Sequence, residues 1–292
     1  MAIVLAVTNQ KGGVGKTTTS VNLASSMVSV KRRVLLIDLD PQGNATMGSG
    51  VEKNQLELSV FDLLAGECSI HEAANRTTSV GYDLLPANSD LTAIEVALLD
   101  APRKEYRLKD ALEQVDDQYD YVLIDCPPSL GMLTINALAA SHGVIIPMQC
   151  EYYALEGLAS LLSTVSKIGS VLNPNLEIDG LLRTMFDPRN SLSNQVSSQL
   201  LQHFGDKVYR TIIPRNVRLA EAPSHGLPAL QYDKKSRGAI AYLSLAGEII
   251  RKNEARAAVS AAKLHGQGSV SSANVSGSVV AEQVREKEAV PS

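Results

Sequence analysis

The stretch from Gln10 to Thr18, with its three glycines and two lysines, constrains the fold more than any other part of the sequence. An apolar run at residues 3–7 precedes it, and apolar residues recur at near-helical spacing between residues 21 and 28. A strand, a glycine-rich loop and a helix start in this order form the context of a phosphate-binding loop. Glycines let backbone N–H groups turn toward an anion, and the helix N-terminus adds unpaired N–H groups and the positive end of its dipole. The stretch therefore predicts a nucleotide phosphate site.

Two side chains of this loop have separate predicted roles. Lys16 is placed to contact the β- and γ-phosphates, and the Thr17 hydroxyl is placed to bind Mg²⁺. The loop departs from the common motif because Gln10 stands where its first glycine is expected and a second lysine follows. A glycine-rich turn with two surface lysines is the alternative, and the flanking strand and helix argue against it. The predicted nucleotide-binding residues are Lys11, Gly12, Gly13, Val14, Gly15, Lys16, Thr17 and Thr18.

The rest of the chain predicts an α/β fold. Strand-like segments alternate with helical patterns, which favours a doubly wound, mostly parallel sheet with helices on both faces. We expect one domain at residues 1–255, followed at residues 256–292 by a helix extension and a tail that is disordered from residue 265. No uninterrupted apolar stretch is long enough to cross a bilayer. The predicted strands lie at residues 3–7, 33–38, 82–86, 119–125, 143–148, 178–186 and 208–213.

Acidic residues follow two of these strands. Asp125 closes an apolar strand in a Walker B pattern, in which the carboxylate can hold a Mg²⁺-bound water. Asp38 and Asp40 lie two residues apart, so both face one side of an extended backbone, where two carboxylates are costly without a cation between them. The alternative is an acidic turn that caps the next segment. Because ligands bind at the carboxyl ends of parallel strands, we expect these acids and the glycine-rich loop on one rim of the sheet.

The loop with its second lysine is a deviant Walker A motif and resembles the ParA/MinD/nitrogenase-iron-protein family of P-loop ATPases. The similarity is closest to ParA/Soj-type chromosome partition ATPases over residues 2–252, on stretches 11–18, 36–44, 124–131, 149–157 and 213–226. It implies an ATP hydrolase that uses ATP and Mg²⁺, turns over slowly by itself and is stimulated by a partner. The implied site residues are Lys11, Lys16 and Asp40 in catalysis, Thr17, Asp38 and Asp125 around the metal, and Pro214 and Asn216 along the adenine pocket.

The resemblance also implies partners. In that family the second lysine reaches the partner's nucleotide across an ATP-dependent homodimer, which implies this role for Lys11, and Glu151 is implied to approach the nucleotide in the same way. A ParB-type centromere-binding protein, a role in chromosome or plasmid segregation, and a cytoplasmic, nucleoid-associated location are implied as well. The sparse cysteines Cys68, Cys126 and Cys150 lack C-x-x-C spacing, which agrees with a reducing cytoplasm.

Charge is distributed unevenly along the chain. Residues 1–182 carry 12 Lys and Arg against 22 Asp and Glu, whereas residues 183–252 carry 11 against 5. A basic segment on an acidic body indicates nucleic-acid binding, and the resemblance implies non-specific double-stranded DNA. Phosphate contacts give such affinity without reading bases. A solvated surface charge is the alternative for each predicted DNA-binding residue: Arg189, Arg215, Arg218, Lys234, Lys235 and Arg237.

Three other functions are alternatives to this interpretation of the sequence. A MinD-like membrane-cycling ATPase needs a C-terminal amphipathic basic helix with large apolar residues, and the tail is instead rich in Ser, Gly, Ala and Val. A redox carrier of the nitrogenase-iron-protein type needs two cysteines per subunit at a dimer seam, which the cysteine placement does not suggest. A nucleotide-gated DNA scaffold with negligible turnover stays open, because no arginine finger is evident in the sequence.

Overall fold

The computed structural model describes residues 2–76, 79–152 and 154–273 of the chain. The chain divides into two compact units, Met1–Ala246 and Gly247–Ser292. The described part of the second unit is the continuation of one helix, α12 (Arg237–Ala273). This helix extends beyond residue 265, where the sequence predicts the start of a disordered tail. The remainder of that predicted tail, residues 274–292, lies outside the described residues.

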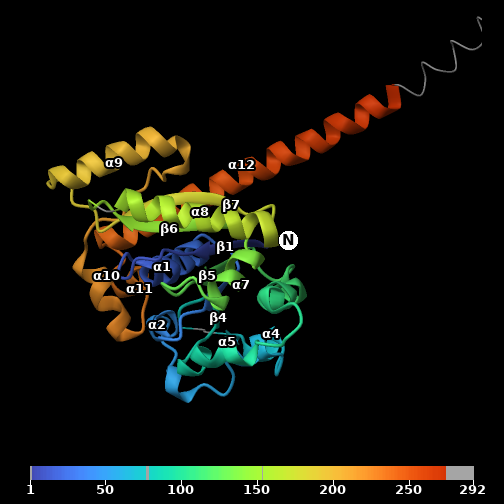
Figure 1. The fold of residues 1–292 in the computed structure, drawn as a ribbon. Coiled ribbons are helices and arrows are strands. Elements are labelled where there is room, and N and C mark those ends of the chain that lie inside the picture. Colours follow the sequence, from blue (N-terminus) through green and yellow to red (C-terminus); the bar gives the residue numbers. More distant parts are fainter. Residues whose placement is uncertain (1, 77–78, 153, 274–292) are drawn as a thin grey trace, which may run out of the picture. The chain divides into compact units, whose positions relative to one another are not determined.

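The first unit is built on a seven-stranded sheet in the order β3-β4-β2-β5-β1-β6-β7. Figure 1 labels β4, β5, β1, β6 and β7 of this sheet. Its neighbouring strands pair in parallel, except that β3 at the edge is antiparallel to β4. This architecture confirms the predicted doubly wound, mostly parallel fold. The strands are β1 (Ile3–Val7), β2 (Val34–Asp38), β3 (Asn75–Arg76), β4 (Asp83–Leu85), β5 (Tyr121–Asp125), β6 (Gly143–Gln149) and β7 (Glu177–Thr184).

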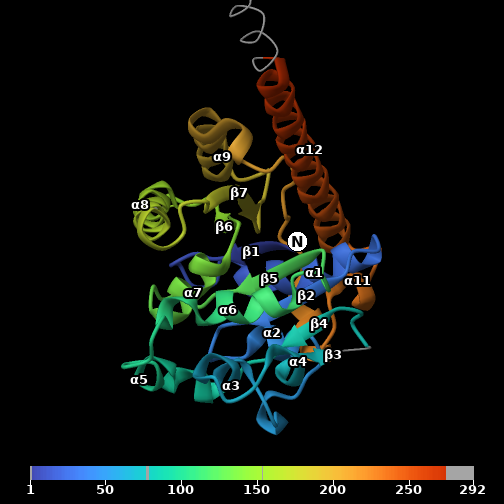
Figure 2. The same cartoon turned by 90° about the vertical axis from the view of Figure 1, so that its right-hand side faces the viewer.

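Helices cover both faces of this sheet. In Figure 2, α7 and α8 lie on one side of the strands, and α1 and α11 lie on the other. Because α1 follows β1 and α7 follows β5, both helices begin near the carboxyl ends of adjacent strands. The helices are α1 (Lys16–Ser29), α2 (Asn44–Gly48), α3 (Val60–Ala65), α4 (Ile70–Ala73), α5 (Ile94–Ala97), α6 (Arg107–Leu112), α7 (Met132–Ala140), α8 (Ala154–Leu172), α9 (Ser191–Phe204), α10 (Val217–Glu221), α11 (Ala229–Tyr232) and the first turns of α12.

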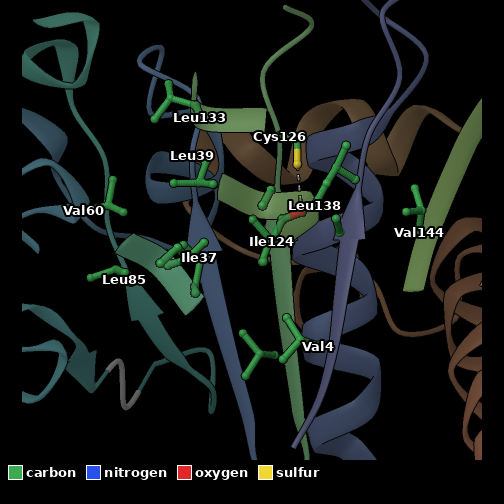
Figure 3. Packing of buried hydrophobic residues seen from close by; sticks show 14 of the residues in the cluster. Val4, Ile37, Leu39, Val60, Leu85, Ile124, Cys126, Leu133, Leu138 and Val144 are labelled. Carbon is green, nitrogen blue, oxygen red and sulfur yellow. Dashed lines mark hydrogen bonds between the residues drawn. The ribbon is translucent and has the colours of Figure 1, made fainter. Parts of the chain in front are cut away.

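One buried cluster fills the face of the sheet that α7 covers. Val4, Ile37, Ile124 and Val144 come from four different strands and share this cluster with Leu138 of α7 (Figure 3). Successive side chains of a strand point to opposite faces of the sheet. The residues that directly precede and follow each of these four in its own strand therefore belong to the other face. Burial on both faces explains why the central strands read as continuous apolar runs. The packed strands hold their carboxyl ends in place, and the functional residues lie there.

The prediction of a strand at residues 208–213 is wrong. Isolated bridges pair Leu181 with Val208 and Phe186 with Pro214, and the residues between them form a loop. The buried Arg183 guanidinium donates to the carbonyl oxygens of Tyr209 at 2.8 Å and Arg210 at 3.3 Å. These carbonyls are therefore bound by a side chain instead of a neighbouring strand, and Pro214 has no N–H to donate.

The helix α8 has an unusual composition. Within the described residues it is the one helix that is long and apolar enough to cross a membrane by length and composition. The sequence predicts no membrane span here, because Ser, Thr, Gly and Lys167 interrupt the apolar residues. Leu158, Leu161 and Val165 form a buried row in the core cluster. That row is the pattern of a helix packed on a sheet.

Candidate nucleotide-binding site

The glycine-rich loop between β1 and α1 has the conformation that its sequence predicts. Gly13 and Gly15 have positive φ values of 72° and 91°, a region that favours glycine. A Cβ at Gly12 or Gly13 would meet nothing within 4 Å, so the loop faces open space. Gly15 precedes α1 and gives its N-terminus no side-chain cap. The unpaired N–H groups at the start of α1 are thus available to an anion.

Lys16 lies at the start of α1 and is only 8% exposed. Its Nζ has a long contact of 3.5 Å to the Lys11 carbonyl oxygen. Burial lowers the pKa of Lys16, and the nearby carboxylates of Asp125 and Asp40 act in the opposite direction. A buried ammonium with such weak hydrogen bonding is suited to an incoming anion such as a phosphate.

Asp125 connects the loop helix to the Walker B strand. Thr17 Oγ1 donates to Asp125 Oδ2 at 2.7 Å, and Ser20 Oγ donates to Asp125 Oδ1 at 2.9 Å. Asp38 lies opposite Asp125 in the β2–β5 register. Burial raises the pKa of both carboxyl groups. The Asp40 carboxylate raises the pKa of Asp38 further, and the Asp38 carboxylate raises the pKa of Asp125 further. A divalent cation would relieve this crowding of negative charge.

Asp38 has a structural role besides any metal role. Its Oδ2 accepts from both the N–H and the hydroxyl of Thr46 at 2.8 Å, and its Oδ1 accepts from the Asp40 N–H at 3.1 Å. Asp38 therefore shapes the loop that carries Asp40. Asp40 is half-buried, and its Oδ1 accepts from the Gln42 N–H at 2.9 Å.

The set Thr17, Asp38 and Asp125 fits a Mg²⁺ site in which phosphate oxygens and water complete the coordination. Oxygen ligands are what Mg²⁺ requires, and it usually keeps only one or two carboxylates. Among the described side chains no group of three or more His, Cys, Asp or Glu could hold a metal by itself.

A cavity of about 180 Å³ adjoins the loop. The Asn216 side chain accepts from the Leu219 N–H at 3.3 Å as the N-cap of α10, which fixes its amide at the cavity wall. The size of the cavity and its mixed polar and apolar lining suit a nucleobase. The structure brings both predicted adenine residues to the loop here, since the lining includes Gly15, Thr18, Pro214, Asn216, Leu219 and Tyr242.

Three further residues at this rim were missed by the sequence analysis. Gln149 Nε2 donates to Gly13 O at 3.3 Å and lies 2.9 Å from Met185 Sδ. Thr184 Oγ1 donates to Val14 O at 2.7 Å. Met185 has a positive φ of 48° and lines the cavity. These residues end β6 and β7, so the rule that places ligands at strand ends could have found them.

The second lysine of the loop is paired within its own chain. Lys11 Nζ forms an ion pair with the Glu151 carboxylate, and both side chains are about half exposed. Glu151 follows the end of β6, which lies beside β1 in the sheet. The structure thus brings together the two residues that the sequence assigns to contacts with a partner's nucleotide.

The six predicted DNA-binding residues fall into two groups. Arg189 pairs with Asp187 at 2.8 Å, and Arg218 pairs with Glu221 at 2.7 Å and more distantly with Asp233. The other four are exposed and form no ion pair in the part of the chain that the structure describes: Arg215, Lys234, Lys235 and Arg237. Arg215 also lines the cavity.

The fold and this site define a P-loop nucleotide-binding protein whose loop carries an additional lysine. A family model described as an AAA domain matches residues 2–178. The sporulation initiation inhibitor protein Soj of Bacillus subtilis is 54% identical over 249 residues, 85% of this chain and 98% of that protein. The chromosome partitioning protein ParA of Caulobacter vibrioides is 51% identical over 260 residues, 88% of this chain and 97% of that protein. The chain belongs to the ParA/Soj family of chromosome-partitioning ATPases, as the sequence predicts.

A solved structure extends this comparison. A protein described as cobyrinic acid a,c-diamide synthase from Mycobacterium smegmatis, with a bound ATP analogue and magnesium, has a TM-score of 0.77 and 40% identity. The match covers 87% of this chain and 96% of that one. Its ligands are the ones that the loop and the acidic residues of the present chain would suit.

Proposed function

We propose that this protein is a Mg²⁺-dependent ATP hydrolase that dimerises with ATP, binds DNA without sequence preference and acts with a ParB-type protein in segregating a chromosome or plasmid. The observation that carries the proposal is the arrangement at the start of α1. There an uncapped helix N-terminus, a buried Lys16 and the Thr17–Asp125 hydrogen bond converge on the open face of the loop. The ATP-analogue and magnesium complex of the similar synthase supports the choice of nucleotide and metal.

Each residue has a distinct part in this mechanism. The N–H groups of the loop and Lys16 hold the phosphates, and Thr17 and Asp125 hold the metal shell. Bound Mg²⁺ neutralises charge on the phosphate oxygens. Asp40 orients the attacking water, and Asp38 keeps the Asp40 loop in place through Thr46. Hydrolysis is slow in the free protein, because positioning is incomplete until a partner binds.

Dimerisation involves Lys11 in this proposal. Lys11 leaves Glu151 and contacts the phosphates bound by the second copy, which makes the dimer depend on ATP. Glu151 then approaches the nucleotide of the other subunit. The half-exposed position of both side chains supports such an exchange.

DNA binding follows from the basic segment. Lys234 and Lys235 directly precede α12 and Arg237 is its first residue, where the helix dipole adds positive potential. A dimer presents this group twice and gains from two-site binding. The protein would therefore occupy the nucleoid in the cytoplasm in its ATP form and leave it after hydrolysis stimulated by the partner.

The proposal is tested by one assay series. Phosphate release is measured with Mg²⁺-ATP, with ATP and a chelator, and with Mg²⁺-ATP plus DNA and a ParB-type protein. We expect slow release that needs Mg²⁺ and rises when DNA and the partner are both present. Absence of release under all three conditions, with nucleotide binding intact, would leave a nucleotide-gated scaffold and contradict the hydrolase.

A further inference from the structure

α7 begins with a backbone donor that a distant carboxylate satisfies. The N–H of Met132, the first residue of α7, donates to Glu95 Oε1 at 3.0 Å across a separation of 37 residues. Gly131 precedes it and provides no side-chain cap. The first N–H groups of a helix have no partner within the helix, and a carboxylate there also meets the positive end of the dipole. Glu95 therefore helps to fix where α7 begins.

Glu95 approaches α7 from a well-packed base. Its neighbours Ile94 and Leu98 are each 1% exposed and belong to the core cluster, whereas Glu95 itself is exposed. A Cβ at position 131 would overlap Glu95 Oε1. Gly131 has a φ of −83°, which other residues adopt readily. A side chain at position 131 would therefore displace the exposed Glu95 carboxylate and leave the backbone conformation unstrained.

The segment tied in this way borders the candidate nucleotide site. Residues 126–131 connect β5 to α7, directly after Asp125. At the start of the segment, the Cys126 N–H donates to Val7 O at 3.2 Å, at the end of the strand that leads into the phosphate-binding loop. Near its end, Thr134 Oγ1 donates to Ser129 O at 2.6 Å. Glu95 adds a tie that comes from neither the strand nor the helix that the segment connects.

We propose that Glu95 is a positioning residue for ATP hydrolysis: it holds the start of α7 and so sets the place of residues 126–131, which follow Asp125 at the candidate nucleotide site. This inference rests on the proposed function. Glu95 acts through the backbone of Met132 and contacts no reacting group. Small displacements of a positioned segment carry large kinetic costs, since a shift of about 1 Å can lower a rate by about 100-fold.

Three variants separate this role from general stability. Glu95→Ala removes the acceptor, Glu95→Gln keeps an acceptor oxygen without the charge, and Gly131→Ala pushes the carboxylate away. Asp100→Ala removes a nearby exposed acid and serves as the matched control. We expect Glu95→Ala and Gly131→Ala to lower kcat about 5- to 100-fold, with KM for ATP changed less than about twofold. Glu95→Gln keeps most of the activity. The double variant that combines Glu95→Ala with Gly131→Ala has a kcat no lower than either single variant, because both substitutions remove the same contact.

Hydrogen exchange of the backbone amides in residues 129–135, measured without nucleotide, reads the contact independently of hydrolysis. We expect faster exchange in Glu95→Ala and Gly131→Ala, with Glu95→Gln and Asp100→Ala close to wild type. Faster exchange with unchanged kcat would make the contact purely structural and overturn the inference, and unchanged exchange would show that the contact does not hold the helix start. If the wild type hydrolyses no ATP, the proposed function fails and this role falls with it, while the exchange data still measure the tie.

Discussion

The Lys11 ammonium forms an ion pair with the Glu151 carboxylate of the same chain. The two side chains are 53% and 52% exposed, and an exposed pair of this kind contributes about 0–1 kcal/mol. Lys11 can therefore exchange this carboxylate for a more highly charged anion at small cost. The role that we propose for Lys11 in the dimer requires such an exchange. The ion pair with Glu151 is then the arrangement of Lys11 before dimerisation.

Lys11→Ala should bind ATP normally and remain a monomer. Lys11 lies outside the minimal phosphate cradle, and in this structure its ammonium points to Glu151 instead of to the loop interior. Light scattering with saturating Mg²⁺-ATP measures the mass in solution, and Lys207→Ala, an exposed lysine far from the loop in sequence, is the control. A dimer of normal stability in Lys11→Ala would rule out the contact between subunits.

Lys16→Ala should lose productive nucleotide binding without loss of folding. A charge-assisted contact to phosphate supports a loss of about 10- to 100-fold in affinity. Because burial lowers the pKa of Lys16, the folded chain disfavours its charge, and loss of the charge by itself should not lower the melting temperature. Calorimetric titration with Mg²⁺-ATP and thermal unfolding without nucleotide measure the two effects. Unchanged affinity in a folded variant would refute the assignment of the loop.

Local sequence patterns predicted the parts of the site that depend on neighbouring residues. The positive φ values of Gly13 and Gly15 follow from the loop motif, and Asp125 follows from the apolar strand that it closes. Pro214 and Asn216 were predicted by family resemblance, and they line the cavity beside the loop.

Contacts between segments that are distant in the chain could not be predicted from the sequence. The hydrogen bond from Met132 to Glu95 depends on how α5 packs, and Gln149 reaches Gly13 because β6 lies beside β1. The prediction of a strand at residues 208–213 was wrong for the same reason, because Arg183 from another element binds the carbonyl oxygens of Tyr209 and Arg210. Apolar alternation gives the propensity of a segment, whereas its hydrogen-bond partners are decided by tertiary structure.

Asp40→Ala should bind Mg²⁺-ATP and accumulate as an ATP-bound dimer. Asp40 is half-buried, and its carboxylate accepts a hydrogen bond from the Gln42 N–H, so its removal leaves the loop glycines and Lys16 in place. Single-turnover hydrolysis should fall about 100-fold or more, within the range of a lost general base. Asp100→Ala, which removes an exposed acid, is the matched control. Hydrolysis at the wild-type rate would show that Asp40 does not orient the water.

The ion pairs divide the predicted DNA-binding residues into two groups with different expected effects. The Arg189 guanidinium holds the pKa of the Asp187 carboxyl at about 2, so this carboxylate stays charged at any assay pH and offsets Arg189. Arg218 is offset in a similar way by Glu221. Lys234, Lys235 and Arg237 have no such partner among the described residues, and they lie at or just before the first residue of α12. These three should supply more of the affinity for phosphates than Arg189 and Arg218 do.

Single alanine substitutions test this ranking in the presence of ATP, where the dimer doubles the basic array. Lys234→Ala, Lys235→Ala and Arg237→Ala should weaken binding to all duplex sequences alike and leave nucleotide binding unchanged. Log affinity falls with log salt by about 0.9 per neutralised phosphate, so each lost contact should make the slope shallower by about one. Arg189→Ala and Arg218→Ala should change the slope less, since a cation that is already paired releases fewer counterions.

A mobility assay over a salt series, with ATP, with ADP and without nucleotide, measures these slopes. Equal effects in both groups would mean that the ion pairs open on DNA, and equal affinity in all three nucleotide conditions would show that the basic segment acts independently of the phosphate-binding loop.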